Sequence, residues 1–181
     1  MNVIDTRYLG CSRRAAALVA TAATTLSLYM SPAMAVDGCQ VLLCLAAPKW
    51  QDVPVCVPTI NALMRDLSRG KPFPVCGMSG NGNTARHDWS SVPDLCPPQY
   101  AHVNLEVTPP IYSCDYAGAV SVTIDQQPFT RTWWTTGGNT VTEYFPAAKT
   151  QLGNWDTRFD DDYTAWLALQ PVVDPSSVPA N

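Results

Sequence analysis

Residues 39–56, CQVLLCLAAPKWQDVPVC, place three cysteines among apolar residues with hardly a charge. Cysteines in such a setting can be metal ligands, a nucleophile with its neighbours, or the disulfides of an exported protein. The choice among these three decides the fold, because a short apolar segment of this kind needs a covalent or metal crosslink to hold its place in a small domain.

The N-terminus has the pattern of a secretory signal peptide. Arg13 and Arg14 precede an uncharged run, residues 15–30, and a small-residue ending follows up to Ala35. This pattern predicts a signal peptide in residues 1–35 that is cleaved after Ala35. A membrane anchor is the alternative, but the run is shorter than the roughly 20 apolar residues that span a bilayer. We therefore expect an exported, periplasmic protein without stable membrane insertion after processing, with the cell surface as the other location.

Length and charge limit the function further. Removal of the leader leaves 146 residues, which suits one domain or a small domain with an extension. The full chain has 11 basic and 15 acidic residues and a net charge of −4; the leader holds three of the basic and one of the acidic residues, so the mature net charge is −6. An acidic chain with no basic run lacks the Lys and Arg that neutralise phosphates, which disfavours direct binding to nucleic acid.

Six cysteines remain after residue 35, and an even number indicates a disulfide framework in an oxidising compartment. A zinc site would favour short spacings such as Cys-x2-Cys, which do not occur here. A catalytic cysteine would be an unpaired thiol with a histidine to activate it. We interpret all six as disulfide cysteines: Cys39, Cys44, Cys56, Cys76, Cys96 and Cys114.

Two short helices are predicted within a cysteine-rich hairpin, residues 36–80. The first has Asp37 as its N-cap, since a carboxylate there accepts backbone N–H bonds and suits the helix dipole, and it ends before Pro48. The second helix is followed by Gly70, which fits the C′ position. Its apolar stripe, at i, i+3, i+4 and i+7, consists of Ile60, Leu63, Met64 and Leu67.

The hairpin suggests how the cysteines pair. Cys39 and Cys44 are about 140° apart around a helix that turns roughly 100° per residue, so they face different partners. Cys44 ends the first helix where Cys56 begins the second, and Cys39 lies near the far end of the second helix, where Cys76 arrives. Six cysteines allow 15 connectivities. The nested hypothesis is Cys39–Cys76, Cys44–Cys56 and Cys96–Cys114.

After residue 80 the character of the sequence changes. Glycine, asparagine and proline predict an irregular connection over residues 81–99. Alternating apolar and polar residues then predict strands within a β-rich extension, residues 100–170, and a final helix from Asp160 to Leu169 ends it. Residues 171–181 are rich in proline and serine and are expected to be a disordered tail. The predicted strands cover residues 102–107, 120–124, 129–134 and 140–145.

The expected fold is therefore α+β, with a disulfide-stapled helical hairpin followed by a small antiparallel β meander and a C-terminal helix.

The cysteine hairpin resembles the TrbM/KikA/MpfK family of conjugal transfer proteins. The matching pattern is CQVLLCL at residues 39–45, a variable loop, Cys56, an amphipathic helix, and Phe73 shortly before Cys76. It covers residues 37–80, about a quarter of the chain. The β-rich part looks like the extension of longer members. The resemblance implies an exported protein that acts with mating-pair-formation machinery, and it supplies no catalytic residues.

The sequence gives little support for catalysis. The mature chain has two histidines, His87 and His102, and no Gly-x-Ser-x-Gly elbow. The run of three aspartates at residues 160–162 lacks the spacing of a calcium loop and is better explained by helix capping. We therefore expect no enzyme, no cofactor and no metal. A cell-wall hydrolase that uses His87 or Glu143 is the least favoured hypothesis.

Trp133 and Trp134 are the binding candidates. Adjacent residues of a strand face opposite sides, so one tryptophan can be core while the other is exposed. An exposed tryptophan can stack on a sugar or anchor a partner protein. The favoured alternative is that both are buried, one beneath the hairpin and the other beneath the last helix.

The resemblance, together with the expected export and the lack of a catalytic constellation, implies a periplasmic accessory protein of a conjugative type IV secretion or mating-pair-formation system, encoded on a plasmid or an integrative element. Its partners would be protein components of the transfer apparatus, and homo-oligomerisation is left open. The alternative is a periplasmic carbohydrate- or peptidoglycan-binding module.

Overall fold

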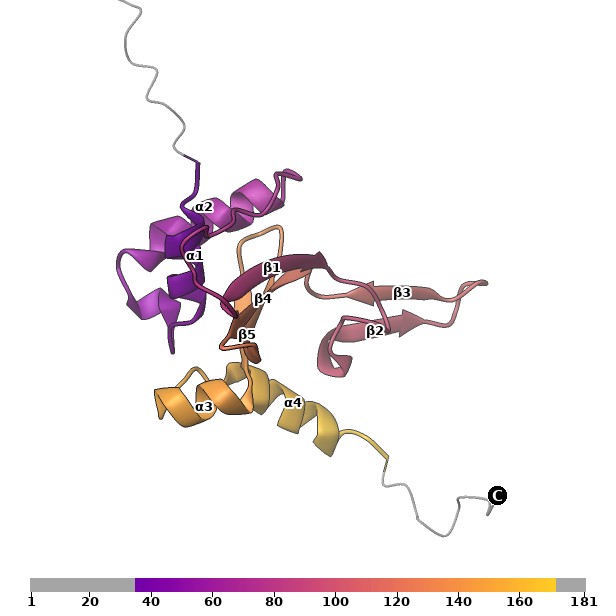
Figure 1. Cartoon of the computed structure of the whole chain (residues 1–181). Helices are drawn as coiled ribbons and strands as arrows, with labels where there is room; N and C mark the ends of the chain where they lie inside the picture. Colours follow the sequence, from indigo (N-terminus) through magenta and orange to yellow (C-terminus); the bar gives the residue numbers. More distant parts are fainter. Residues whose placement is uncertain (1–34, 172–181) are drawn as a thin grey trace, which may run out of the picture. The chain divides into compact units, whose positions relative to one another are not determined.

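The computed structural model describes residues 35–171. The expected signal peptide and tail lie outside these residues, apart from Ala35 and Pro171 at their borders. The described chain is α+β and contains two sheets, one four-stranded with the order β1-β4-β5-β6 and one two-stranded, β2-β3 (Figure 1). Its α-helices and strands are α1 Gly38–Leu45, α2 Cys56–Leu67, β1 Thr84–Trp89, β2 Ala101–Asn104, β3 Ile111–Cys114, β4 Gly118–Ile124, β5 Gln127–Trp134, β6 Thr140–Tyr144, α3 Pro146–Leu152 and α4 Arg158–Ala168.

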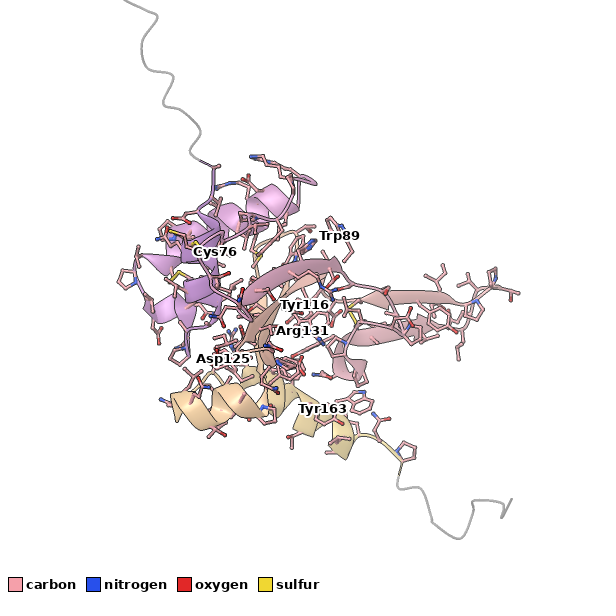
Figure 2. The ribbon with its side chains drawn as sticks, viewed as in Figure 1. Cys76, Trp89, Tyr116, Asp125, Arg131 and Tyr163 are labelled. Carbon is pink, nitrogen blue, oxygen red and sulfur yellow. A yellow bond between two sulfur atoms is a disulfide. The ribbon has the colours of Figure 1, made fainter. Side chains whose placement is uncertain are left out.

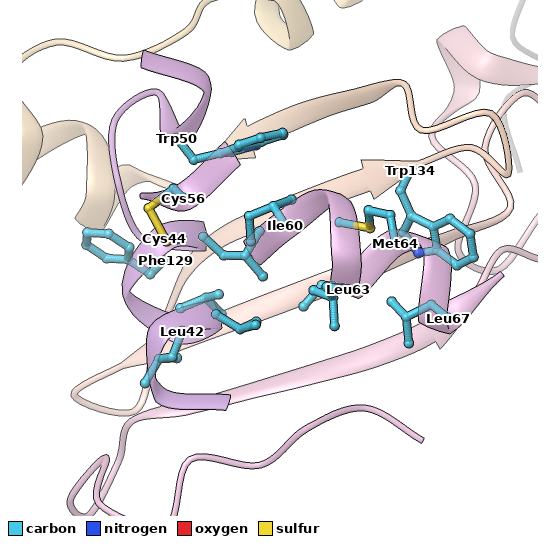
Figure 3. Packing of buried hydrophobic residues seen from close by; sticks show 14 of the residues in the cluster. Leu42, Cys44, Trp50, Cys56, Ile60, Leu63, Met64, Leu67, Phe129 and Trp134 are labelled. Atoms are coloured by element: carbon cyan, nitrogen blue, oxygen red, sulfur yellow. A yellow bond between two sulfur atoms is a disulfide. The ribbon is translucent and has the colours of Figure 1, made fainter. Parts of the chain in front are cut away.

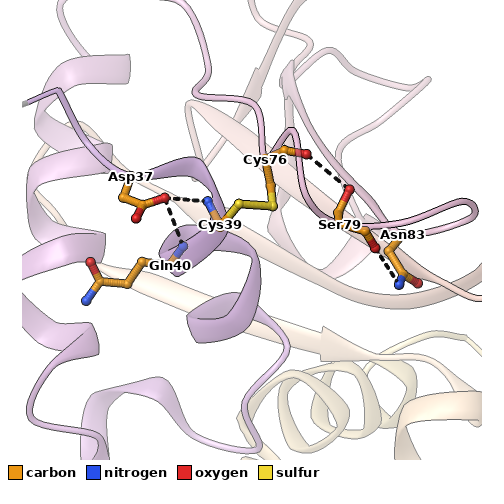
Figure 4. Close-up of a disulfide and its surroundings, with 6 residues drawn as sticks. All are labelled: Asp37, Cys39, Gln40, Cys76, Ser79 and Asn83. Atoms are coloured by element: carbon orange, nitrogen blue, oxygen red, sulfur yellow. Dashed lines mark hydrogen bonds between the residues drawn. A yellow bond between two sulfur atoms is a disulfide. The ribbon is translucent and has the colours of Figure 1, made fainter.

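Helix α1 begins as the sequence predicts. The Asp37 carboxylate accepts the backbone N–H groups of Cys39 at 2.8 Å and Gln40 at 3.4 Å, which satisfies two of the donors that a helix N-terminus leaves free (Figure 4). A short 3-10 helix, Trp50–Asp52, lies in the loop that leads to α2.

Helix α2 ends at Leu67 and is closed by a glycine turn. Lys71 donates its N–H to the Asp66 carbonyl and Gly70 donates to the Leu67 carbonyl, with φ of +74° at Gly70. This is the glycine C′ turn that the sequence predicts for Gly70. The apolar stripe of the helix is buried, and Figure 3 shows Met64 close to Trp134 of the sheet.

The six cysteines form three disulfides: Cys39–Cys76, Cys44–Cys56 and Cys96–Cys114. They are the pairs of the nested hypothesis. The first bond draws the segment after α2 so close to α1 that Gly38 has no room for a side chain, because a Cβ there would lie 2.5 Å from the Val75 carbonyl carbon.

The hairpin at residues 36–80 and the β-rich extension at residues 100–170 share one core. Residues of α1, α2, β4, β5, β6 and α3 all belong to the same buried cluster. The Thr130 hydroxyl donates to the Leu45 carbonyl, and the Tyr144 hydroxyl donates to the Pro48 carbonyl at 2.6 Å. Side chains of the sheet thus satisfy carbonyls at and just after the end of α1, where a helix leaves them without partners.

The irregular connection predicted for residues 81–99 is wrong over β1. This strand pairs antiparallel with β4, from Thr84 opposite Thr123 to Trp89 opposite Gly118. Its sequence, TARHDW, has few β-branched or apolar residues because it is an edge strand whose side chains are partly or fully exposed. Backbone pairing with β4 sets its structure, and no periodic pattern reveals it.

The meander β4-β5-β6 is confirmed. Asp125 and Gln126 connect β4 to β5 with φ of +49° and +64°, a two-residue turn held by the Asn83 side chain, which accepts the Asp125 N–H at 2.9 Å. The strand expected at residues 102–107 lies outside this sheet. It ends at Asn104 and pairs only with β3, which the sequence pattern does not predict.

The last helix, α4, is present close to its predicted bounds. It has no fully buried residue. The preceding helix, α3, follows directly from β6 and is not indicated by the sequence pattern. Figure 2 shows Tyr163 on α4 and Trp89 on β1 among the side chains.

Candidate interaction surface

A two-stranded arm, residues 101–114, extends from the four-stranded sheet (Figure 1). Its base is fixed in three ways. The Cys96–Cys114 disulfide ties β3 to the preceding segment, and the buried ring of Tyr100 packs edge-on against Tyr116 with centroids 4.9 Å apart. The Tyr100 hydroxyl also donates to the Asp162 carboxylate on α4 at 2.6 Å.

The arm carries apolar side chains that nothing in residues 35–171 covers. Their exposed fractions lie between 40% and 75%. The arm has no Lys or Arg and one acidic residue, Glu106. A concentration of exposed apolar side chains on one element of a folded chain marks a surface that meets a partner. The residues are Val103, Leu105, Val107, Ile111 and Tyr112.

A second apolar feature, the α1 groove, lies beside the Cys39–Cys76 disulfide. It is a cavity of about 380 Å³ between α1, the segment at residues 76–83 and Ile124. Leu43 and Met78 on its rim are 72% and 88% exposed. The Ser79 hydroxyl donates to the Cys76 carbonyl and the Asn83 amide donates to the Ser79 carbonyl, and both bonds fix the loop that borders it (Figure 4).

The two binding candidates from the sequence, Trp133 and Trp134, are both fully buried at 0% exposure. They face opposite sides of β5, as strand geometry requires. Trp134 packs in the core that α1 and α2 cover, and Trp133 packs in a second cluster with Cys96, Tyr100 and Phe159 of α4. The favoured expectation, that both are buried, is therefore confirmed, and neither ring is exposed to stack on a ligand at the surface.

Trp89 is an exposed tryptophan that no pattern in the sequence singles out. Its ring lies 5.0 Å from the His87 ring and 5.6 Å from the Trp134 ring, centroid to centroid, and its backbone is paired with Gly118 of β4. A Cβ at Gly118 would lie 2.8 Å from the His87 ring, so glycine is needed for this packing. Burial lowers the pKa of His87, and Asp88 opposes the shift.

The other candidate catalytic residues from the sequence lie on different elements. His102, on the arm, contacts Asp115 at 2.8 Å, whereas His87 lies on β1. Glu143 on β6 has its pKa raised by burial, which Arg131 at 3.7 Å opposes. The aspartates of α4 have different partners: Asp160 binds Lys149 at 2.7 Å, Asp161 accepts from Thr157, and Asp162 accepts from Tyr100.

Within residues 35–171 no three His, Cys, Asp or Glu side chains are grouped so that they could hold a metal ion. No helix in the same residues is long and apolar enough to cross a membrane.

No protein-family model, curated protein or solved structure matches this chain.

Proposed function

We propose that this chain is an exported accessory protein of a conjugative mating-pair-formation system, and that it acts by binding a protein component of the transfer apparatus through the arm. The assignment to conjugation rests on the resemblance of residues 37–80 to the TrbM/KikA/MpfK family. The assignment to protein binding rests on the exposed apolar side chains of the arm.

The charge of the arm selects the class of partner. Binding to anionic lipid or nucleic acid draws on Lys and Arg, and residues 101–114 contain neither. Apolar side chains such as Leu105 and Ile111 gain most from a complementary apolar cleft, at about 25 cal/mol per Å² buried. The partner is therefore a protein with an apolar cleft that accepts the end of the hairpin.

The disulfide at the base supports this role. An interaction element binds more tightly when little conformational freedom is lost on docking. The Cys96–Cys114 bond and the Tyr100–Asp162 hydrogen bond hold the arm on the folded unit before a partner arrives.

A transfer assay tests the proposal. Donor cells that lack the gene should transfer DNA less efficiently, and the wild-type gene should restore transfer. The double variant Leu105→Ser/Ile111→Ser should accumulate in folded, oxidised form and fail to restore it. Leu169→Ser, an exposed leucine after α4 and outside both apolar features, is the matched control and should restore transfer fully.

A photo-crosslinking residue at position 105 identifies the partner in the same cells. We expect a crosslink to a transfer component from position 105 and none from position 169, where Leu169 is equally exposed after α4. Normal transfer by the deletion strain would contradict the conjugal function. Normal transfer by the arm variant would contradict only the use of the arm.

A further inference from the structure

Strand β1, Thr84–Trp89, is an open edge of the four-stranded sheet. It pairs with β4 on one side, and no other backbone segment within residues 35–171 forms hydrogen bonds with its outer side (Figure 1). The opposite edge, β6, is buried at every residue except Glu143, whereas every residue of β1 is partly or fully exposed. An exposed edge presents free N–H and C=O groups that can pair with another strand. Of the two edges of this sheet, β1 is the one available for such pairing.

The ladder with β4 determines which groups of β1 face outward. Ser90 donates its N–H to the Ala117 carbonyl at 2.9 Å. In an antiparallel pair the hydrogen bonds recur at every second residue, so those directed at β4 continue at Asp88 and Arg86. The residues between them direct their N–H and C=O groups to the outer side of the sheet. These residues are Ala85, His87 and Trp89.

The charges of β1 are complementary to a second copy of the same strand. Arg86 and Asp88 project from the same face, 3.0 Å apart, with 77% and 32% of their side chains exposed. An antiparallel copy centred on His87 places Arg86 of each copy directly opposite Asp88 of the other. A slip of two residues in either direction places Arg86 opposite Arg86 or Asp88 opposite Asp88. Since opposite charges stabilise a cross-strand pair and like charges destabilise it, the register centred on His87 is favoured.

The other face of β1 fits the same register. Trp89 of each copy lies opposite Ala85 of the other, on the face that α1 and α2 cover. The Trp89 side chain is 55% exposed, and a small residue opposite it leaves room for the indole to be buried. At the centre the two His87 side chains meet. Burial lowers the pKa of His87, so both imidazoles are neutral at about pH 7 and do not repel each other.

We propose that two copies of this chain dimerise through β1, which forms an antiparallel pair centred on His87 and joins the two four-stranded sheets into one. A second copy fits this edge because a two-fold axis at His87 satisfies each charge of β1 with the opposite charge of the other copy. The strand has six residues, so the interface is small and the Kd is about 100 µM or tighter. The proposal rests neither on the conjugal function nor on the arm.

Sedimentation equilibrium of the processed, oxidised protein from about 5 µM to 1 mM tests the association itself. We expect a monomer–dimer equilibrium. A monomer at every concentration in this range would overturn the proposal.

Charge exchange tests the register. Arg86→Asp places an aspartate opposite Asp88, and Asp88→Arg places an arginine opposite Arg86, so each variant should raise the Kd about tenfold. The double variant Arg86→Asp/Asp88→Arg should dimerise as the wild type does. An equimolar mixture of the two single variants should form heterodimers with a similar Kd. Arg69→Asp, the same change at an exposed position after α2, is the matched control and should leave the Kd unchanged.

Amide hydrogen exchange tests the use of the edge independently of the charges. The amides of Ala85, His87 and Trp89 should exchange more slowly at about 1 mM than at about 10 µM, because they are bonded in the dimer and free in the monomer. The amides of Arg86 and Asp88 are bonded to β4 in both states and should not change.

Two further results would overturn the proposal. The first is a dimer that neither single charge variant weakens, since its contact would lie elsewhere. The second is a dimer that is lost in Leu105→Ser/Ile111→Ser, which would place the contact on the arm. The dimer is measured by sedimentation of the charge variants and the arm by DNA transfer, so the two proposals fail independently.

Discussion

The hydroxyl of Thr130, in the middle of the sheet, donates a 2.7 Å hydrogen bond to the carbonyl oxygen of Leu45, the last residue of α1. Both residues are buried, and they are 85 positions apart in the chain. No disulfide joins the hairpin to the sheet among the three bonds of the described residues. Non-covalent contacts of this kind therefore hold α1 against the four-stranded sheet.

Thr130→Val should lower the free energy of unfolding by about 1–3 kcal/mol, because it leaves the buried Leu45 carbonyl without a donor while the volume is kept. Urea denaturation measures the change. Thr136→Val, at an exposed turn position, is the control and should be close to neutral. Equal stability of the two variants would show that the Leu45 carbonyl finds another donor.

Gly38→Ala should destabilise the protein although alanine favours a helix over glycine by roughly 0.5–1 kcal/mol. The new Cβ would lie 2.5 Å from the Val75 carbonyl carbon and 2.6 Å from its oxygen, so the segment that carries Cys76 has to move. We expect a net loss of about 1–3 kcal/mol, as in other overpacked sites.

Gly77→Ala is the matched control for this change, since a Cβ added at Gly77 would meet no heavy atom within 4 Å beyond its neighbours in the chain. It should leave the melting temperature nearly unchanged. A Gly38→Ala protein as stable as the wild type would contradict the close approach of the two segments.

Tyr100→Phe should loosen the contact between the base of the arm and α4. The phenol donates to the Asp162 carboxylate at 2.6 Å, and burial and this bond raise the pKa of Tyr100. We expect a loss of about 1–2 kcal/mol, because the carboxylate remains accessible to water after the change. Hydrogen exchange should quicken in β2 and α4 and stay unchanged in α2. Tyr112→Phe, an exposed tyrosine on the arm, should have no such effect.

Stability should depend on pH through His87. Its pKa is lowered below 6.5 by burial, with Asp88 opposing, so the unfolded chain binds a proton at a higher pH than the folded chain does. The stabilisation is therefore present above pH 6.5 and is lost as the pH falls through the folded pKa. Thermal melts between about pH 8 and pH 5 should show this fall, and His87→Gln should reduce it.

Glu143 changes the free energy of unfolding with pH in the opposite direction to His87 over part of the same pH range. Burial raises its pKa above 4.5, so its contribution is present at low pH and is lost as the pH rises through the folded pKa. Because Glu143 is unchanged in His87→Gln, the difference between the two melting curves isolates His87. An identical pH profile for wild type and variant would contradict the burial of this imidazole.

The local patterns that the sequence makes visible are those set by neighbours along the chain. The cap at Asp37, the stripe on α2 and the turn at Gly70 depend on contacts within about one helical turn, and all three are present. The meander is equally visible, because β4, β5 and β6 alternate or run apolar through the core.

The missed features depend on pairing between distant segments. Strand β1 has no alternation of apolar and polar residues, and it forms because its backbone pairs with β4. Whether the side chains of Trp133 and Trp134 are buried depends on which elements pack against each face of the sheet. The sequence therefore predicts burial of both or exposure of one, and does not decide between them. The cavity on the face of the sheet opposite α1 and α2 is lined by residues from position 95 to position 163, and no spacing in the sequence indicates that these distant segments come together.

The bond between Cys39 and Cys76 encloses the one between Cys44 and Cys56. An oxidase that joined thiols in their order of emergence from a translocation channel would first couple Cys39 to Cys44, which is a non-native bond. Native protein then forms only after thiol–disulfide exchange. The yield of correctly folded molecules should accordingly depend on a disulfide isomerase in the compartment where the chain matures, whereas Cys96 and Cys114, neighbours in the series, need none.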